Sequence, residues 1–276
     1  MTLFASAEEK IRRATHHTNS LKGDVARFFA EKTYEIRQVP NFETGRKQAV
    51  YRALADLPGE WPIILGEIMH NLRSALDHMI TALTILEKGH ALEGTEFPVF
   101  ESEFDYSRVR SKGPHRGEPA AGSGLHKIRG LGSNAKAVVR SLQPFEVRKT
   151  LPPQQQPALA LIHALNVIDK HCSIHVVRRM TANYGWRVVR DINLPFNFKL
   201  PVGEVTDGTI LAEWSPVGAL DSEIDMEFEW GFDLCFGDGD QEVAILNGSP
   251  VIPICECLIH NGARHTLSRL AATVPL

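Results

Sequence analysis

The stretch that decides the fold runs from Trp61 to Lys88 and reads WPIILGEIMHNLRSALDHMITALTILEK. Its apolar residues recur at the three- and four-residue spacing of an amphipathic helix, which predicts one long helix over about residues 61–87. Pro62 in the first turn and Gly89 just past the last turn are typical of the two ends of a helix. Because one face of this helix is apolar along its whole length, that face must be buried against other elements.

The polar side of the same helix is unusual in composition. The nine residues His70–His78, HNLRSALDH, contain no Lys, Glu or Gln, which are the common residues of a solvated helix face. At about 100° per residue, the polar side chains lie opposite the apolar arc, with Arg73 at the edge. A solvated face or a hydrogen-bonded dimer interface would explain the pattern, and so would a reaction site. The polar residues of this stretch are His70, Asn71, Arg73, Ser74, Asp77 and His78.

Arg73 and His78 are the candidate catalytic residues. A guanidinium group matches the oxygens of a phosphate, and an imidazole exchanges a proton near neutral pH. Together they are suited to transfer of a ribose 2′-hydroxyl onto the neighbouring phosphate. In that reaction His78 acts as base or acid, and Arg73 stabilises the charged phosphorus centre. This chemistry requires no metal ion and no other cofactor.

The segment RSALDH, residues 73–78, resembles the Arg-x4-6-His motif of the HEPN superfamily. Members of that superfamily are all-helical, mostly dimeric modules, and many are metal-independent endoribonucleases of toxin–antitoxin and phage-defence systems. The resemblance therefore implies a homodimer that cleaves RNA. It covers this motif and, loosely, the first 175 residues, and it leaves out the β-rich remainder. Ser74 stands where the family more often has Asn or a larger polar residue.

A second polar cluster lies in the helix expected over about residues 157–172. This helix is apolar almost all round, which predicts a central position, and an unpaired carboxylate there is costly. Asp169 therefore needs a partner, for which Arg73 is the natural candidate and His70 or His78 are alternatives. The cluster is either a structural network or a support for the catalytic pair. The expected supporting residues are His70, Asn71, Ser74, Asp77, Asn166 and Asp169.

The same two helices leave a metal site open as an alternative. A helix bundle could collect enough ligands, although neither helix contains a His-x3-His or Glu-x2-His pair, so we expect no metal. The potential ligands are His70, Asp77, His78, His163, Asp169 and His171. The four cysteines fit neither a paired zinc site nor a disulfide framework, which favours a reducing cytoplasm. No signal-peptide core or membrane span is expected.

The charge is distributed asymmetrically along the chain. Residues 106–150 contain ten Lys or Arg and two acids, whereas residues 200–263 contain thirteen acids and no Lys or Arg. The two segments either neutralise each other or form a polyanion-binding strip and an acidic surface for a partner protein. The strand region EIDMEFEWGF, residues 223–232, is the candidate for that acidic surface. The RNA contacts expected in the basic segment are Lys127, Arg129, Lys136 and Arg140.

The overall pattern predicts an α+β fold. We expect helices over about residues 6–172, interrupted by a hairpin around PNFETGR, then an antiparallel sheet to about residue 247 and a closing helix. The expected division is a helical bundle, 1–173, and a β region with the closing helix, 174–276. In the bundle, the N-terminal and long helices combine with the two helices that follow the basic loop. Three functions remain open: a HEPN-like metal-independent endoribonuclease, a non-catalytic dimeric interaction protein with a β-rich partner-binding region, and a metal-dependent helix-bundle enzyme.

Overall fold

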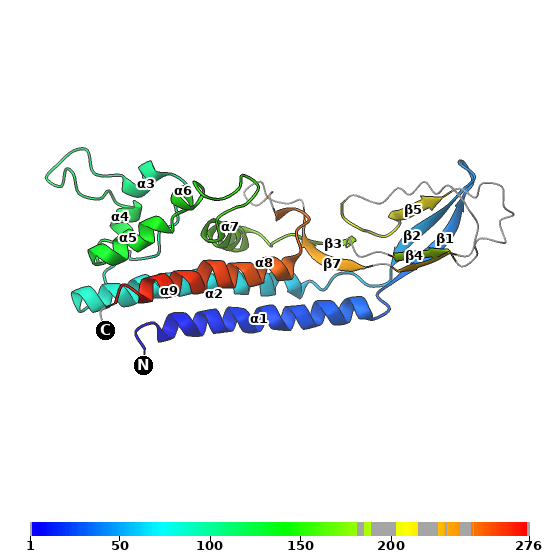
Figure 1. Ribbon diagram of the computed structural model, residues 1–276, viewed down its shortest axis with the longest axis horizontal. Coiled ribbons are helices and arrows are strands. Elements are labelled where there is room, and N and C mark those ends of the chain that lie inside the picture. Colours follow the sequence, from blue (N-terminus) through cyan, green and yellow to red (C-terminus); the bar gives the residue numbers. More distant parts are fainter. Residues whose placement is uncertain are drawn as a thin grey trace.

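A computed structural model describes residues 2–180, 185–188, 203–214, 226–229, 231–237, 244 and 246–274. Long helices fill one end of the elongated molecule and strands extend toward the other end (Figure 1). The α+β composition expected from the sequence is confirmed. None of the helices in the described part of the chain is long and apolar enough to cross a membrane.

The long helix α2, Glu60–Lys88, forms as predicted. Gly89 ends it with a positive φ of 78°, and the Gly89 N–H donates to the Ile85 carbonyl, which satisfies one of the last free carbonyls of the helix. Its apolar arc is the centre of the main core, where Leu65, Leu72 and Leu76 are fully buried.

Four helical segments form the bundle around this core. Helix α1, Ala5–Ala30, packs along α2, and α7, Ala158–His171, packs on another side of α2. The fourth member is the C-terminal run of α8, Val251–Cys257, the π-helix η2, Leu258–Arg264, and α9, His265–Ala271.

This arrangement corrects the predicted bundle, in which the helix near residues 133–142 was the fourth member. Helix α5, Ser133–Ser141, does form there, but it buries only Ala135 and Val139 and lies against α9. Such a short helix cannot cover α1 and α2 along their length. The C-terminal run covers them because it places buried residues in all three of its segments, among them Cys255, Leu258 and Leu270. Three further short helices precede α7: α3, Glu103–Ser107, α4, Gly124–Lys127, and α6, Pro144–Val147.

The strands of the described residues pair in the antiparallel sense, as expected. The predicted hairpin is present: β1, Tyr34–Asn41, pairs with β2, Arg46–Ala53, and Gly45 turns the chain with a φ of 66°. In place of one sheet, the described strands form three, with orders β1-β2-β5, β3-β7 and β4-β6. The remaining strands are β3, Val176–Met180, β4, Gly185–Val188, β5, Ile210–Trp214, β6, Met226–Glu229, and β7, Phe232–Phe236.

The helical bundle and the β1-β2-β5 sheet each contain elements from before and after residue 173, because the C-terminal run packs into the bundle and β5 pairs with β2. These contacts do not test whether 1–173 and 174–276 are separate domains, and the expected division stays a prediction. Much of the acidic segment that we expected to bind a partner protein, including residues 215–225 and 238–243, lies outside the described residues.

A buried arginine connects the helical bundle to the strands. Arg178 of β3 is 5% exposed, and its guanidinium lies 5.6 Å from the centre of the Phe28 ring and 5.1 Å from that of Tyr51. It also donates to the Ala55 carbonyl at 3.3 Å. Stacking on aromatic rings offsets part of the cost of burying this cation. Arg178 therefore holds the end of α1, the hairpin and β3 together.

Gly124→Ala should destabilise the fold. A Cβ at this position would lie 2.2 Å from the ring of Tyr106, which is 1% exposed and packs against Phe145. We expect a loss of about 1–3 kcal/mol in the free energy of unfolding, measured by urea denaturation. Gly23→Ala is the matched control, because nothing lies within 4 Å of a Cβ there and the helix should gain about 1 kcal/mol. Equal stability of the two variants would contradict the packing described for Tyr106.

Candidate functional site

The polar residues of α2 divide between two sides of the helix. Arg73 and Asp77 contact the segment that follows α2, at Phe97, whereas His78 contacts α1 at Ser6. No hydrogen bond or ion pair between Arg73 and His78 occurs among the described residues. The two predicted catalytic residues are therefore not brought together within one chain.

Arg73 and Asp77 hold the backbone of Phe97. Nη2 of Arg73 donates to Oδ1 of Asp77 at 2.9 Å and to the Phe97 carbonyl at 2.6 Å, while the Phe97 N–H donates to the same Asp77 oxygen at 2.9 Å. Burial raises the pKa of Asp77, although Arg73 and the Phe97 N–H act in the opposite direction. The Arg73 side chain is only 10% exposed. Both backbone groups of Phe97 are thus satisfied, and the side chain of Phe97 is fully buried.

Further charges surround this pair. Oε2 of Glu96 lies 3.8 Å from Nη2 of Arg73, and Lys127 binds the other Glu96 oxygen at 2.7 Å. Burial lowers the pKa of His163, and the positive charges of Arg73 and Lys127 lower it further. Nη1 of Arg73 is buried and has no hydrogen-bond partner among the described residues. The guanidinium therefore belongs to an interior charge network and is not presented to solvent.

The environment of Asp169 differs from the one predicted from the sequence. We expected it to be largely buried and hydrogen-bonded to α2 near Arg73, but it is half-buried beside Gly66 and shares a pocket with His70. Burial raises the pKa of Asp169, with His70 acting in the opposite direction. The reason is that Asp77 and Glu96 already neutralise Arg73 on another side of α2. Asn166 is 2% exposed and lies in the core.

On the other side of α2, Glu67 and His78 contact α1. We call the polar residues of the two helices along this edge the polar seam. Nδ1 of His78 is hydrogen-bonded to Oγ of Ser6 at 2.8 Å, and Nε2 of His17 lies 3.5 Å from Oε2 of Glu67. These two contacts are eleven residues apart on both helices, so the helices run antiparallel in matched register. The seam consists of Ser6, Lys10, Arg13 and His17 on α1 and of Glu67, His70, Asn71, Ser74 and His78 on α2.

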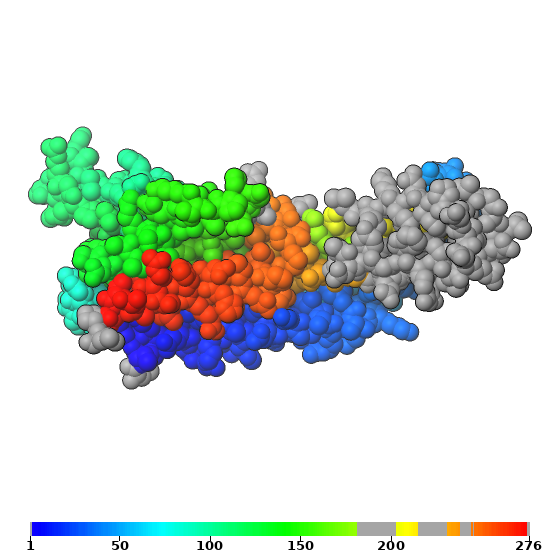
Figure 2. All heavy atoms as spheres, in the orientation of Figure 1, coloured from blue at the N-terminus to red at the C-terminus, as the bar shows by residue number. Residues whose placement is uncertain are grey.

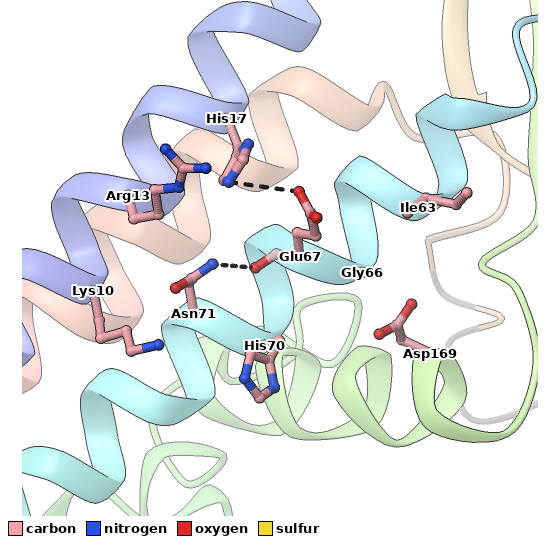
Figure 3. A pocket seen from close by; sticks show the side chains of 9 residues that line it. All are labelled: Lys10, Arg13, His17, Ile63, Gly66, Glu67, His70, Asn71 and Asp169. Carbon is pink, nitrogen blue, oxygen red and sulfur yellow. Dashed lines mark hydrogen bonds and ion pairs between the residues drawn. The ribbon is translucent and has the colours of Figure 1, made fainter.

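A pocket of about 510 Å³ opens on this seam (Figure 3). Lys10, Arg13 and His17 reach it from α1, Glu67, His70 and Asn71 from α2, and Asp169 from α7, with Ile63 and Gly66 completing its lining. Gly66 is required for this approach, because a Cβ there would lie 1.8 Å from an Asp169 oxygen.

Hydrogen bonds on α2 fix part of the pocket wall. Nδ2 of Asn71 donates to the Glu67 carbonyl at 2.8 Å, and Oγ of Ser74 lies 3.4 Å from Nε2 of His70. Burial lowers the pKa of His17, and the charge of Arg13 lowers it further, whereas Glu67 acts in the opposite direction. His17 therefore favours its neutral form, in which one ring nitrogen accepts a proton.

Five of the predicted site residues belong to the seam or its pocket: His70, Asn71, Ser74, His78 and Asp169. Sequence reasoning missed the α1 side of the site and Glu67. The sequence does contain a pattern that indicates the α1 residues. Polar residues recur there at spacings of four, three and four residues, at Ser6, Lys10, Arg13 and His17. The same spacings separate Glu67, Asn71, Ser74 and His78 in the opposite direction, as expected for two antiparallel helices with a shared polar edge.

The four predicted RNA-binding residues lie elsewhere, and three of them have partners within the chain. Lys127 binds Glu96, Arg140 contacts Glu103 and Glu146, and Arg129 donates to the carbonyls of His126 and Glu93. Lys136 is half-buried on α5. Their role in RNA binding stays a prediction.

Within the described part of the chain, no group of three or more His, Cys, Asp or Glu side chains is arranged to hold a metal ion. Comparison of the chain with protein-family models, curated proteins and solved structures finds no match. The resemblance of the segment RSALDH to the HEPN motif therefore stays a prediction from the sequence.

Asp77→Ala should destabilise the protein by about 3 kcal/mol, because it leaves the buried Arg73 cation without its closest carboxylate and frees the Phe97 N–H. Thermal or urea unfolding measures the change. Asp77→Asn keeps an oxygen acceptor for both groups and should lose less. Glu96→Gln removes a more distant, 44% exposed carboxylate and should cost less than about 1 kcal/mol. A melting temperature that Asp77→Ala leaves unchanged would show that the pair does not hold this segment.

Proposed function

We propose that the protein is a metal-independent endoribonuclease whose reaction centre is the pocket on the polar seam. One observation carries this proposal: two histidines, His17 and His70, and two cations, Lys10 and Arg13, line the same pocket. Cleavage of RNA by its own 2′-hydroxyl needs a base, an acid and positive charge beside the phosphate. Histidines and cations that share one open pocket supply all three.

In the proposed reaction, neutral His17 takes the proton of the 2′-hydroxyl as its oxygen attacks the adjacent phosphorus. The new O2′–P bond replaces the P–O5′ bond, and protonated His70 gives its proton to the departing 5′ oxygen. Lys10 and Arg13 neutralise the charge that develops on the phosphoryl oxygens. The lowered pKa of His17 suits a base, and the Asp169 carboxylate lines the same pocket as His70.

This proposal retains the reaction predicted from the sequence but assigns it to the pocket residues instead of Arg73 and His78. Arg73 is occupied by Asp77 and the Phe97 carbonyl, so we assign phosphate binding to the α1 cations instead. His78 lies further along the same seam, at Ser6, where it extends the surface available to the RNA. A homodimer, which the HEPN resemblance implies, would carry two such pockets, and a role in toxin or phage-defence systems belongs to the same proposal.

The second candidate is a non-catalytic interaction protein. The burial of Arg73 favours a structural role for that residue, and Ile63, which is 63% exposed, lies at the pocket where an apolar side chain of a partner could cover it. On this reading the polar seam orients a partner helix, and the histidines serve as hydrogen-bonding groups.

His17→Gln and His70→Gln should each lower RNA cleavage by at least about 100-fold, which is the usual contribution of a general acid or base. The assay follows a labelled single-stranded RNA incubated with purified protein in EDTA. His90→Gln is the matched control, because His90 is exposed after the end of α2 and, in the part of the chain that the structure describes, bonds only the Lys88 carbonyl. Cleavage by His17→Gln at the wild-type rate would disprove the site. Activity that EDTA abolishes and added metal restores would favour a metal-dependent enzyme.

The pH dependence of cleavage provides a separate prediction. Because the pKa of His17 lies below its ordinary value of 6.5, the neutral base persists at pH 6.5. The fall of the rate on the acid side should therefore have its midpoint below pH 6.5 in a plot of rate against pH. A midpoint above that value would assign the base to another group.

A further inference from the structure

Residues 108–121 form an ordered projection that we call the basic arm. It extends from the end of the molecule where both termini lie, on the side away from α1 (Figures 1 and 2). The arm is held by its own backbone: the Arg110 N–H donates to the Glu118 carbonyl at 2.8 Å, and the Ala120 N–H donates to the Arg108 carbonyl at 2.9 Å. These bonds hold the two sides of the arm together through its backbone.

Three cations of the arm differ from most of the other cations in the basic segment. Arg110, Lys112 and Arg116 are exposed and form no ion pair among the described residues. The only acid in the arm, Glu118, pairs with His115 at 3.1 Å. Elsewhere in the segment, Lys127, Arg140, Arg148 and Lys149 are each paired with a carboxylate. Carboxylates thus neutralise these four cations, whereas Arg110, Lys112 and Arg116 stay without one among the described residues.

An exposed aromatic side chain lies at the base of the arm. Phe104 of α3 is 75% exposed, although Tyr106 of the same short helix is 1% exposed in the core. Val109, at the start of the arm, is 48% exposed. An exposed ring and unpaired cations within the same short stretch of chain are the combination on which proteins bind single-stranded nucleic acids, with bases stacked on the ring and phosphates on the cations.

We propose that the basic arm and Phe104 bind single-stranded RNA. Arg110, Lys112 and Arg116 contact phosphates, and Phe104 stacks on an unpaired base. A paired base is already stacked in its duplex, so the ring selects single strands. This inference rests on the proposed function for the identity of its partner. The arm and the polar seam lie on different sides of the bundle, so that binding and cleavage can be measured apart.

The experiment measures the binding of a fluorescein-labelled oligo(U) strand by anisotropy, at several salt concentrations between about 50 and about 200 mM. The triple variant Arg110→Gln, Lys112→Gln, Arg116→Gln should raise Kd at least about tenfold at the lowest salt. It should also reduce the slope of log K against log salt by about 2, because each phosphate contact on a single strand contributes about 0.7. Phe104→Ala should raise Kd by about fivefold or more and leave the slope unchanged, because stacking releases no counterions.

The matched control removes three cations that are exposed but paired. Lys22→Gln, Arg27→Gln, Arg52→Gln changes the net charge equally, and its residues are bound to Glu256, Asp24 and Asp207. This variant should keep most of the affinity and the slope. An equal loss in both triple variants would overturn the proposal in favour of non-specific attraction. Tighter binding to a duplex RNA, or to vesicles that contain phosphatidylserine, would also overturn it.

The outcomes separate the two proposals. If the arm variants lose binding as predicted and the wild-type protein does not cleave the strand, the arm is confirmed and the endoribonuclease proposal fails. If the arm variants bind and cleave as wild type does, the arm proposal fails and the pocket is unaffected.

Discussion

A buried arginine in the middle of the longest helix has to be neutralised within the protein, and much of the architecture around α2 follows from this requirement. Asp77, one turn further along, supplies the charge, and the Phe97 backbone supplies a second acceptor. The segment after α2 is therefore held against the helix that precedes it, which fixes where the basic segment leaves the bundle. An unpaired guanidinium at 8% exposure would cost several kcal/mol, so the chain cannot release Phe97 without a large penalty.

The same requirement explains why the polar side of α2 serves two purposes. Residues committed to Arg73 face the Phe97 segment, and the remaining polar residues meet α1. Polar groups along this second line stay accessible because α1 contributes Ser, Lys, Arg and His at matching positions instead of apolar side chains. An α1–α2 edge with apolar residues there would pack more tightly and leave no pocket. The pocket therefore depends on which polar residues the first helix carries as much as on the second.

Sequence periodicity predicted α2, its ends and the hairpin, because each depends on local patterns: apolar spacing, Pro62, Gly89 and a turn between two alternating runs. The partner of Asp169 and the fourth member of the bundle could not be predicted in this way. Both depend on contacts between segments far apart in the chain, such as α7 with Gly66 and the C-terminal run with α1. The α2 half of the site could be predicted from the unusual composition of HNLRSALDH. The α1 half has an ordinary composition, so its residues can be assigned to the site only when the antiparallel register of α1 and α2 is known.

The π-helix η2 interrupts a C-terminal run that would otherwise be one α-helix. A π-turn holds an additional residue within the same helical rise, and each residue of an α-helix accounts for about 100° of rotation. The interruption therefore changes the angular phase of the run: α8 presents one set of side chains to the bundle, and α9 presents a set that an unbroken helix would turn elsewhere. Gly262 lies within this wide turn, where a Cβ would lie 2.6 Å from Ile162. The change of rotation and the close approach to Ile162 thus both occur within η2. The number of residues in the C-terminal run is therefore fixed, because inserting or deleting one residue before α9 would rotate the buried face of α9 away from the core.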